Sequence, residues 1–151
     1  MAAKEELIKS DLTTKFAFLA DKIRISRDRR IFAELPAANL RDVLGYAVKN
    51  LGFVFLCTIS GLDEGENLSF VYHLTRQDGI MLNLKISVPK DKGSIKTVTD
   101  YFTGADIYER EVMDLLGAKV EGLPEGNRYP LPDDWPKGQY PLRKDWKADK
   151  K

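Results

Sequence analysis

The sequence predicts a two-layer α+β fold, with a mostly antiparallel sheet, helices on one face and a long extended C-terminal tail. Three observations indicate this class: apolar stripes at helical spacing, runs of residues that alternate with period two, and a proline-rich end. The chain has 151 residues, which at about 100–200 residues per domain allows one domain and an extension. We expect an α+β domain at 1–117 and an extended arm at 118–151.

Composition and charge exclude several classes of protein. Hydrophobic residues form 43% of the chain and charged residues 31%, which excludes collagen-like and wholly disordered chains. The formal net charge is +1 at pH 7, so the broad basic footprint of a dedicated nucleic-acid binder is missing. The single cysteine, Cys57, fits a reducing compartment. With no apolar run of membrane-spanning length, we expect the cytosol or a cytosolic face.

Two helices are expected in the first third of the chain. Apolar residues at helical spacing predict a helix within 3–22. The clearest helix covers 37–51, where one apolar stripe recurs every three or four residues. Pro36 suits the entry to that helix, and Gly52 suits the left-handed residue after its end.

Four further segments are interpreted as strands or a hairpin. Residues 23–35 predict a hairpin that turns near Asp28. Residues 53–59 form a nearly continuous apolar run, typical of a central strand buried on both faces. Residues 68–75 and 80–88 alternate between apolar and polar positions, which indicates antiparallel strands with one covered face.

A third helix is expected from about Gly104 to Leu116. Thr103 and Asp106 have the spacing of a capping box, with aspartate in place of the usual glutamate. Gly117 is a natural stop, because glycine readily adopts the left-handed conformation that ends helices.

No residue pattern predicts catalysis. His73 lies in an alternating strand, on the face opposite Tyr72, with no second histidine to share a metal. Cys57 lies in an apolar strand, where burial raises the pKa of a thiol and suppresses its reactivity. The chain has no glycine-rich phosphate loop, dinucleotide fingerprint or cysteine cluster. We therefore predict no catalytic, cofactor-binding or metal-binding residues in this chain.

The densest polar cluster lies on the third helix. Asp106, Arg110 and Asp114 are four residues apart and share a face, whereas Glu109 and Glu111 point to different sides. One interpretation is a solvated ladder of ion pairs, worth tenths of a kcal/mol per pair. The other is that Arg110 and Glu111 anchor the following tail or a partner surface.

The tail at 118–151 contains five of the seven prolines, a density that excludes helix interiors and central strands. It is also rich in aromatic residues, which disordered linkers normally lack. Three interpretations remain open: the tail docks on its own domain, it wraps a neighbouring subunit, or its basic end binds nucleic acid or anionic lipid.

Several motifs in the second half resemble a known family. The stretch from Ala105 to Gly117, ADIYEREVMDLLG, is similar to the signature of the C-subunit family of NADH:quinone oxidoreductase, respiratory complex I. That family includes related subunits of energy-converting membrane-bound hydrogenases. The resemblance also covers Phe70–Leu74, Glu121-Gly122, Leu131–Trp135 and the Pro-Leu-Arg-Lys-Asp-Trp sequence at 141–146.

The resemblance implies a structural subunit in the hydrophilic arm of an ion-pumping oxidoreductase complex, without an active site of its own. It would brace the large catalytic subunit, which forms a quinone or nickel–iron site, and contact iron–sulfur subunits. Iron–sulfur clusters and a flavin or nickel–iron centre are then expected in partner subunits. The chain would be peripheral, on the cytoplasmic face of the cell membrane, and would meet the membrane only through the complex. The residues expected at partner interfaces are Glu109, Arg110, Glu111, Asp114, Asp133, Trp135, Arg143, Lys144 and Asp145.

Some features depart from the respiratory members of the family. Gly122-Leu123-Pro124 stands where they usually have Gly-His-Pro, and 127–130 lacks their basic, aliphatic run. The sequence therefore leaves open whether the complex is an NADH-linked enzyme or belongs to the hydrogenase or alternative-donor branch. It also leaves open the electron donor and acceptor, the pumped ion and the stoichiometry of the complex. Two rival functions are a self-contained small enzyme using Glu109, Glu111 and His73, and a nucleic-acid adaptor using the Arg24–Arg30 hairpin and the basic C-terminus.

Overall fold

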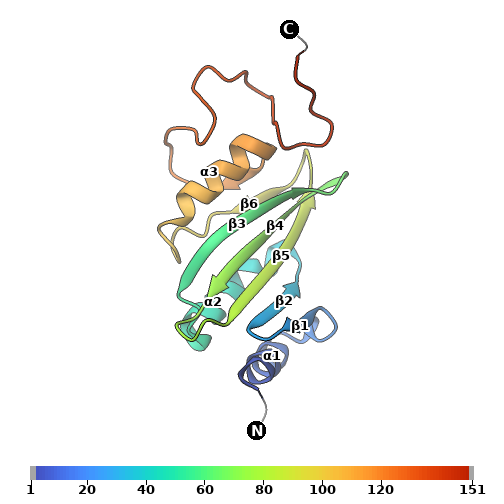
Figure 1. Cartoon of the computed structure of the whole chain (residues 1–151), viewed down its shortest axis with the longest axis vertical. Helices are drawn as coiled ribbons and strands as arrows, with labels where there is room; N and C mark the ends of the chain where they lie inside the picture. Colours follow the sequence, from blue (N-terminus) through green and yellow to red (C-terminus); the bar gives the residue numbers. More distant parts are fainter. Residues whose placement is uncertain (1–2, 150–151) are drawn as a thin grey trace. The chain divides into compact units, whose positions relative to one another are not determined.

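The computed structural model describes residues 3–149 and has the α+β architecture that the sequence predicts (Figure 1). Helices and strands follow one another in the order α1 (Lys4–Lys15), β1 (Ile23–Arg27), β2 (Arg30–Glu34), α2 (Leu40–Leu51), β3 (Phe55–Asp63), β4 (Asn67–Thr75), β5 (Met81–Pro89), β6 (Ser94–Lys96), α3 (Ala105–Leu116) and β7 (Lys119–Glu121). Single 3₁₀ turns at Ala17–Leu19 and Ala37–Asn39 follow α1 and precede α2.

The main sheet has five strands in the order β1-β2-β5-β4-β3. The β1–β2 hairpin is antiparallel, with Ile25 opposite Ile31, and it turns at the predicted place. β2 then runs parallel to β5, with Ile31 opposite Leu82. A second, two-stranded sheet pairs β6 and β7 in parallel. The sequence predicts neither parallel pair, because both join segments that are distant in the chain.

The chain forms two compact units. Unit 1 contains the residues up to Thr58 together with Val71–Ile86, and unit 2 contains Ile59–Phe70 and the residues from Ser87 onward. The strands β3, β4 and β5 each contribute residues to both units.

The core of unit 1 is built on α2 and the alternating strands. The apolar stripe of α2 is buried at Leu40, Val43, Leu44 and Ala47, and the helix lies behind the sheet in the view of Figure 1. Gly52 ends α2 with φ of 75°, as predicted, and it does so without strain because glycine tolerates this region.

The first helix, expected within 3–22, occupies the first part of that range. It ends at Lys15, because Phe16 has φ of −126° and ψ of 85°, outside the helical region. The hydroxyls of Thr13 and Thr14 both donate to the Ser10 carbonyl, a contact that competes with helical bonding. The ring of Phe16 instead meets Tyr46 edge-on, with ring centroids 5.6 Å apart.

The third strand is placed differently from the prediction. The apolar run at 53–59 predicts a central strand, but β3 lies at one end of the sheet order, next to β4 alone among the described strands. Phe55 is 50% exposed, and Cys57, expected to be buried, is exposed as well. The predicted central position of this strand and the predicted burial of Cys57 are therefore both wrong. An apolar sequence does not prove burial, because much of the surface of a folded protein is itself apolar.

Unit 2 is organised around α3. Gly61 of β3 lets α3 approach closely: a Cβ there would lie 2.4 Å from a methyl of Leu116 and 3.1 Å from one of Val112. Gly117 ends α3 with φ of 72°, as predicted. The expected capping box is absent, because Gly104 is the N-cap and no side chain caps the helix.

Candidate functional site

The C-terminal arm, residues 118–149 in the structure, is held to the rest of unit 2 by three anchors built on charged side chains. The anchors use two aspartates, Asp114 and Asp63, and one arginine, Arg143. Two anchors join the arm to α3, which directly precedes it, and the third joins it to the end of β3. They bring together most of the residues that the sequence singles out.

The first anchor is the buried carboxylate of Asp114 on α3. Its Oδ1 accepts hydrogen bonds from Arg128 Nη2 at 2.7 Å and Nε at 2.9 Å. Its Oδ2 accepts the main-chain amide of Leu131 at 2.8 Å. Arg128 also donates to the carbonyl of Trp135 at 3.1 Å. One carboxylate thus fixes the course of the arm over several residues.

The second anchor is Arg143, whose side chain is 15% exposed. Its Nε donates to the Leu116 carbonyl at 2.7 Å, where α3 leaves an unpaired C=O. Its Nη1 donates to Asp91 Oδ1 at 3.0 Å. Its guanidinium also lies 4.8 Å from the ring centroid of Tyr140. Arg143 therefore closes the C-terminal end of α3.

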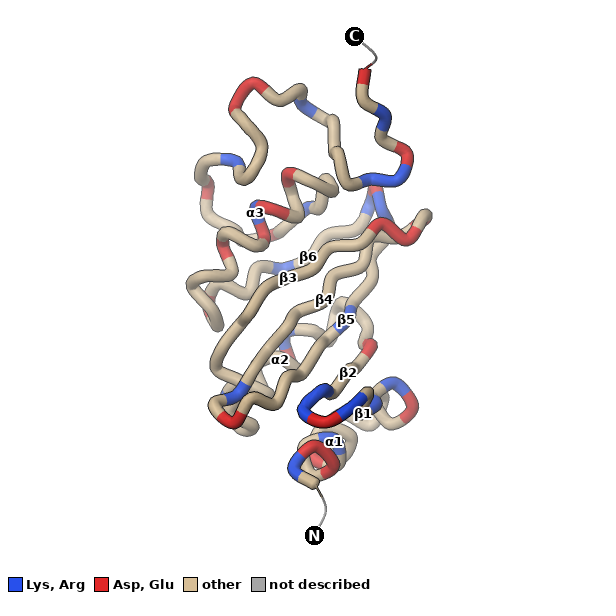
Figure 2. The backbone as a smooth tube through the Cα atoms, viewed as in Figure 1, with Lys and Arg blue, Asp and Glu red and all other residues tan. Residues whose placement is uncertain are grey.

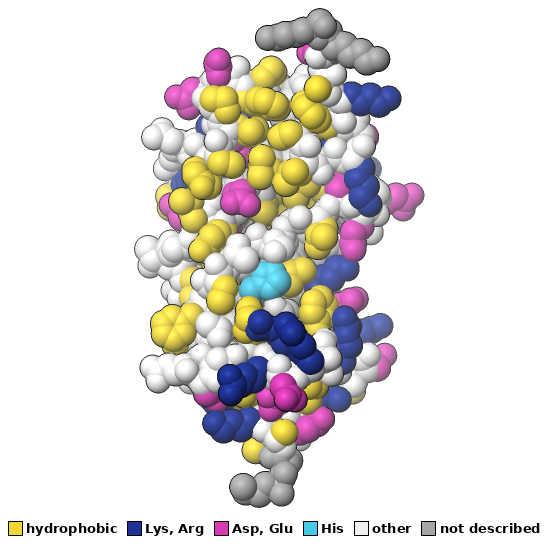
Figure 3. All heavy atoms as spheres, viewed as in Figure 1, with side chains coloured by type: hydrophobic (Ala, Val, Ile, Leu, Met, Phe, Trp, Pro, Cys, Tyr) yellow, Lys and Arg dark blue, Asp and Glu magenta, His cyan; other side chains and the backbone are white. Residues whose placement is uncertain are grey.

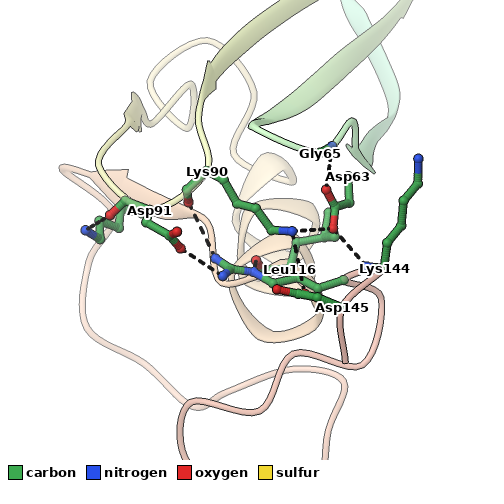
Figure 4. Close-up of polar contacts among 9 residues, drawn as sticks. Asp63, Gly65, Lys90, Asp91, Leu116, Lys144 and Asp145 are labelled. Atoms are coloured by element: carbon green, nitrogen blue, oxygen red, sulfur yellow. Dashed lines mark hydrogen bonds and ion pairs between the residues drawn. The ribbon is translucent and has the colours of Figure 1, made fainter. Parts of the chain in front are cut away.

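The third anchor is Asp63, at the end of β3 (Figure 4). Its Oδ2 accepts Lys90 Nζ at 2.7 Å and the amide of Lys144 at 2.8 Å, and its Oδ1 accepts the amide of Gly65 at 2.9 Å. Lys90 Nζ also lies 3.5 Å from Asp145. Burial alone raises the pKa of Asp63, but these donors outweigh it and lower the pKa from 3.8 to about 2.

Glu109 is buried inside unit 2 and binds residues after β6. Its two oxygens accept Thr97 Oγ1 at 2.7 Å and the Val98 amide at 2.8 Å. Burial raises the pKa of this carboxyl, against the lowering effect of those two donors. Because Glu109 is fully buried, a partner can contact only the residues around it.

The predicted ion-pair ladder on α3 is only half formed. Arg110 pairs with Asp106 and also donates to the Pro124 carbonyl at 2.6 Å, so it contacts the arm in addition to the three anchors. Asp114 points to Arg128 instead of to Arg110. Glu111 is half-buried on the same helix.

The remaining predicted interface residues lie within the arm. Trp135 is half-buried, with its Nε1 donating to the Gln139 carbonyl at 2.8 Å and its ring centroid 6.0 Å from that of Trp146. Asp133, Asp145 and the side chain of Lys144 are exposed. The structure thus seats part of the predicted set inside the chain and leaves the rest on the surface.

Sequence reasoning missed Asp63, Lys90 and Arg128. Asp63 and Lys90 are 27 residues apart and lie at strand ends, where charged residues are ordinary. Arg128 lies in a proline-rich segment without periodicity. No local pattern identifies them, since their role depends on contacts made only in the folded chain.

The other candidate groups do not form a catalytic arrangement. His73 Nδ1 lies 2.6 Å from Asn83 Oδ1, on the face opposite the buried Tyr72 and Leu74, as predicted. The histidine ring reaches the surface in Figure 3. Within residues 3–149, no three His, Cys, Asp or Glu side chains gather as metal ligands. None of the described helices has the length and apolar character needed to cross a membrane.

Comparison with known proteins assigns the chain to a family. Residues 33–151 match the family described as "Respiratory-chain NADH dehydrogenase, 30 Kd subunit". The C-subunit of the F(420)H(2) dehydrogenase of Methanosarcina mazei is 34% identical over 140 residues, covering 91% of this chain and 88% of that protein. The C-subunit of the NADH-quinone oxidoreductase of Moorella thermoacetica is 31% identical, covering 75% of this chain and 77% of that protein.

Solved structures agree with this assignment. A chain of the membrane-bound sulfane sulfur reductase, an archaeal respiratory membrane complex, has a TM-score of 0.85 and 30% identity, covering 96% of this chain and 86% of its own. The trypsin-resistant fragment of Nqo5 has a TM-score of 0.68 and 27% identity, covering 82% of this chain and all of the fragment. The chain belongs to the 30 kDa subunit family of the respiratory-chain NADH dehydrogenase, which confirms the resemblance found in its motifs.

Proposed function

We propose that this protein is a non-catalytic structural subunit in the hydrophilic arm of a complex I-like, ion-pumping oxidoreductase, where it braces the large catalytic subunit. The observation that carries this proposal is the anchored C-terminal arm. Three charged anchors fix the arm within unit 2. A segment fixed this way can present a preformed surface, so a partner spends little free energy on ordering it.

The arm keeps apolar groups at its surface after it has docked. Tyr129 is 43% exposed and Leu142 is 56% exposed, although both lie within a few residues of an anchor. Tyrosine is one of the residues that most often dominate the energetics of protein interfaces, and an exposed leucine beside it adds apolar area that a partner can bury. Of the other interface candidates, Asp133, Lys144 and Asp145 are exposed on the same arm.

The redox centres are assigned to partner subunits. We propose that a large subunit with a quinone or nickel–iron site and iron–sulfur subunits are the neighbours of this chain, and that flavin, where present, is also held elsewhere in the complex. The chain is then peripheral, on the cytoplasmic face, and meets the membrane only through its partners. Its relatives include subunits of an NADH-quinone oxidoreductase and of an F(420)H(2) dehydrogenase. The electron donor of this complex is therefore identified by the experiment below.

The test is purification of a tagged copy from native membranes in mild detergent, followed by mass spectrometry. We expect the large and iron–sulfur subunits to co-purify, and the donor module identifies the branch. Leu142→Lys should reduce recovery of the large subunit at least tenfold, since it places a charge in the proposed surface. Leu7→Lys on α1, where Leu7 is 60% exposed, is the matched control and should leave recovery unchanged. Recovery of the chain alone would contradict the proposal.

A further inference from the structure

The β3 strand has the composition of an interior strand but lies at a sheet edge. No charged residue occurs between Lys49 and Asp63 in the sequence. Within unit 1, Val54 is 46% exposed, Phe55 is 50% exposed and Cys57 is exposed. Among the described strands, β4 is the only neighbour of β3.

The opposite edge of the same sheet is protected. β1 carries Arg24 and Arg27, and its register with β2 shifts between Ile25 and Arg27. Figure 2 shows blue and red along the β1–β2 turn, whereas the β3 tube carries no charge until its far end. Charges and irregular register are the devices by which proteins stop edge strands from pairing with other chains. The β1 edge thus carries features that prevent pairing with another chain, and residues 55–58 at the β3 edge carry none of them.

A hollow adjoins the beginning of β3. It has a volume of about 420 Å³ and is lined by Leu51, Gly52, Val54, Arg76, Gln77 and Asp78. Arg76 and Asp78 satisfy each other at 3.1 Å. The aliphatic wall formed by Leu51 and Val54 is therefore left to receive an uncharged side chain.

We propose that an extended segment of a partner subunit adds to the sheet by pairing with residues 55–58 of β3. Main-chain hydrogen bonds to a strand edge give affinity, and alternate side chains give specificity. The partner segment carries uncharged residues where it meets Phe55 and Cys57, and one apolar side chain enters the hollow beside Val54. This interface is built from residues of unit 1, none of which belongs to the arm. It rests on the proposed function only in requiring an assembled complex.

Cys57 provides a direct test, because it is the single cysteine. N-ethylmaleimide should label it rapidly in the purified chain and at least tenfold more slowly in the complex isolated from membranes. The control is Leu7→Cys in a Cys57→Ser background, which should react equally in both states. Equal labelling of Cys57 in an intact complex would overturn this proposal and leave the proposed function standing. Failure of the wild-type chain to co-purify with other subunits would overturn both.

Hydrogen exchange distinguishes strand addition from other coverings. In an edge strand every second amide points outward, so pairing should slow exchange at alternate amides within 55–58 in the complex. Protection of the thiol without this alternation would mean that a partner covers the sheet face, and would contradict strand addition. Slow labelling in the isolated chain that disappears on dilution would identify a second copy as the occupant, which also contradicts it. Phe55→Lys should lower recovery of partners without changing the thermal unfolding of the chain.

Discussion

The carboxylate of Asp63 accepts the main-chain amide of Lys144 at 2.8 Å, across 81 positions of sequence. Lys90 neutralises the same carboxylate at 2.7 Å, and the Asp63 side chain is only 1% exposed. A buried charge is tolerated only when it is paired and hydrogen-bonded, and here both conditions are met. The end of β3 and the last motif of the arm are thereby joined in one polar cluster (Figure 4).

Asp63→Asn should destabilise the chain at neutral pH and make its free energy of unfolding depend less on pH in the acid range. The pKa of Asp63 is lowered from 3.8 to about 2, so its stabilising effect is present above pH 3.8 and is lost as the pH falls through about 2. The amide side chain lacks this charge and leaves Lys90 with only the longer, 3.5 Å pairing to the exposed Asp145. We expect a loss of about 2 kcal/mol at pH 7 and a smaller decrease between pH 4 and pH 2 than in the wild type, measured by urea unfolding.

Asp133→Asn is the control for this prediction, because Asp133 is exposed on the arm. Glu109 contributes to the pH dependence with the opposite sign: its raised pKa means that stability is lost as the pH rises through its folded-state value. The difference between wild type and Asp63→Asn removes that contribution. Parallel acid limbs in the two proteins would show that Asp63 does not titrate as described.

Gly117→Ala should cost more stability than Gly52→Ala. Both glycines end helices with positive φ, 72° and 75°, and carry the same conformational penalty of about 1–2 kcal/mol for alanine. A Cβ at Gly117 would also lie 2.5 Å from the Tyr140 ring, whereas nothing lies within 4 Å of one at Gly52. We expect an additional loss of about 1–3 kcal/mol for Gly117→Ala in urea unfolding.

Tyr140→Leu provides the second half of that comparison. Combined with Gly117→Ala, it should remove much of the additional loss, because the smaller side chain leaves room for the new methyl group. Equal costs for the two alanine substitutions would mean that the Tyr140 ring does not pack against the end of α3.

Local patterns predicted the elements whose residues meet neighbours close in sequence. The α2 stripe with Gly52, the hairpin at Asp28 and the alternation of β5 all depend on short-range geometry. The edge position of β3 could not be predicted, since an apolar run looks the same whether it is covered by the chain itself or left exposed. The anchors at Asp63 and Asp114 were also beyond local reasoning. Apart from the Gly65 amide, their donors lie 14 to 81 residues away, and the arm that supplies most of them has no periodicity.

Asp114→Asn should loosen the arm near Arg128. Asparagine keeps one oxygen but turns an NH₂ group toward the Leu131 amide, which then loses its acceptor. We expect a loss of about 2 kcal/mol in stability and faster tryptic cleavage after Arg128, followed by mass spectrometry. Asp134→Asn, on an exposed residue of the arm, should leave the cleavage rate unchanged. Unaltered cleavage in Asp114→Asn would indicate that other contacts hold this part of the arm.

Trp135 tests whether the arm serves a partner as well as its own unit. Within the chain its Nε1 donates to the Gln139 carbonyl at 2.8 Å and its ring neighbours Trp146. These two contacts are worth about 1–2 kcal/mol together, so Trp135→Ala should cost the isolated chain that amount in urea unfolding. If the half-buried ring also enters a desolvated partner pocket, assembly should lose about 2 kcal/mol or more beyond this, measured as the fraction of large subunit recovered with the tagged chain.

Trp135→Phe keeps an aromatic ring and should restore most of the assembly loss but not the Nε1 hydrogen bond. An assembly loss no larger than the stability loss would show that Trp135 packs only within its own chain.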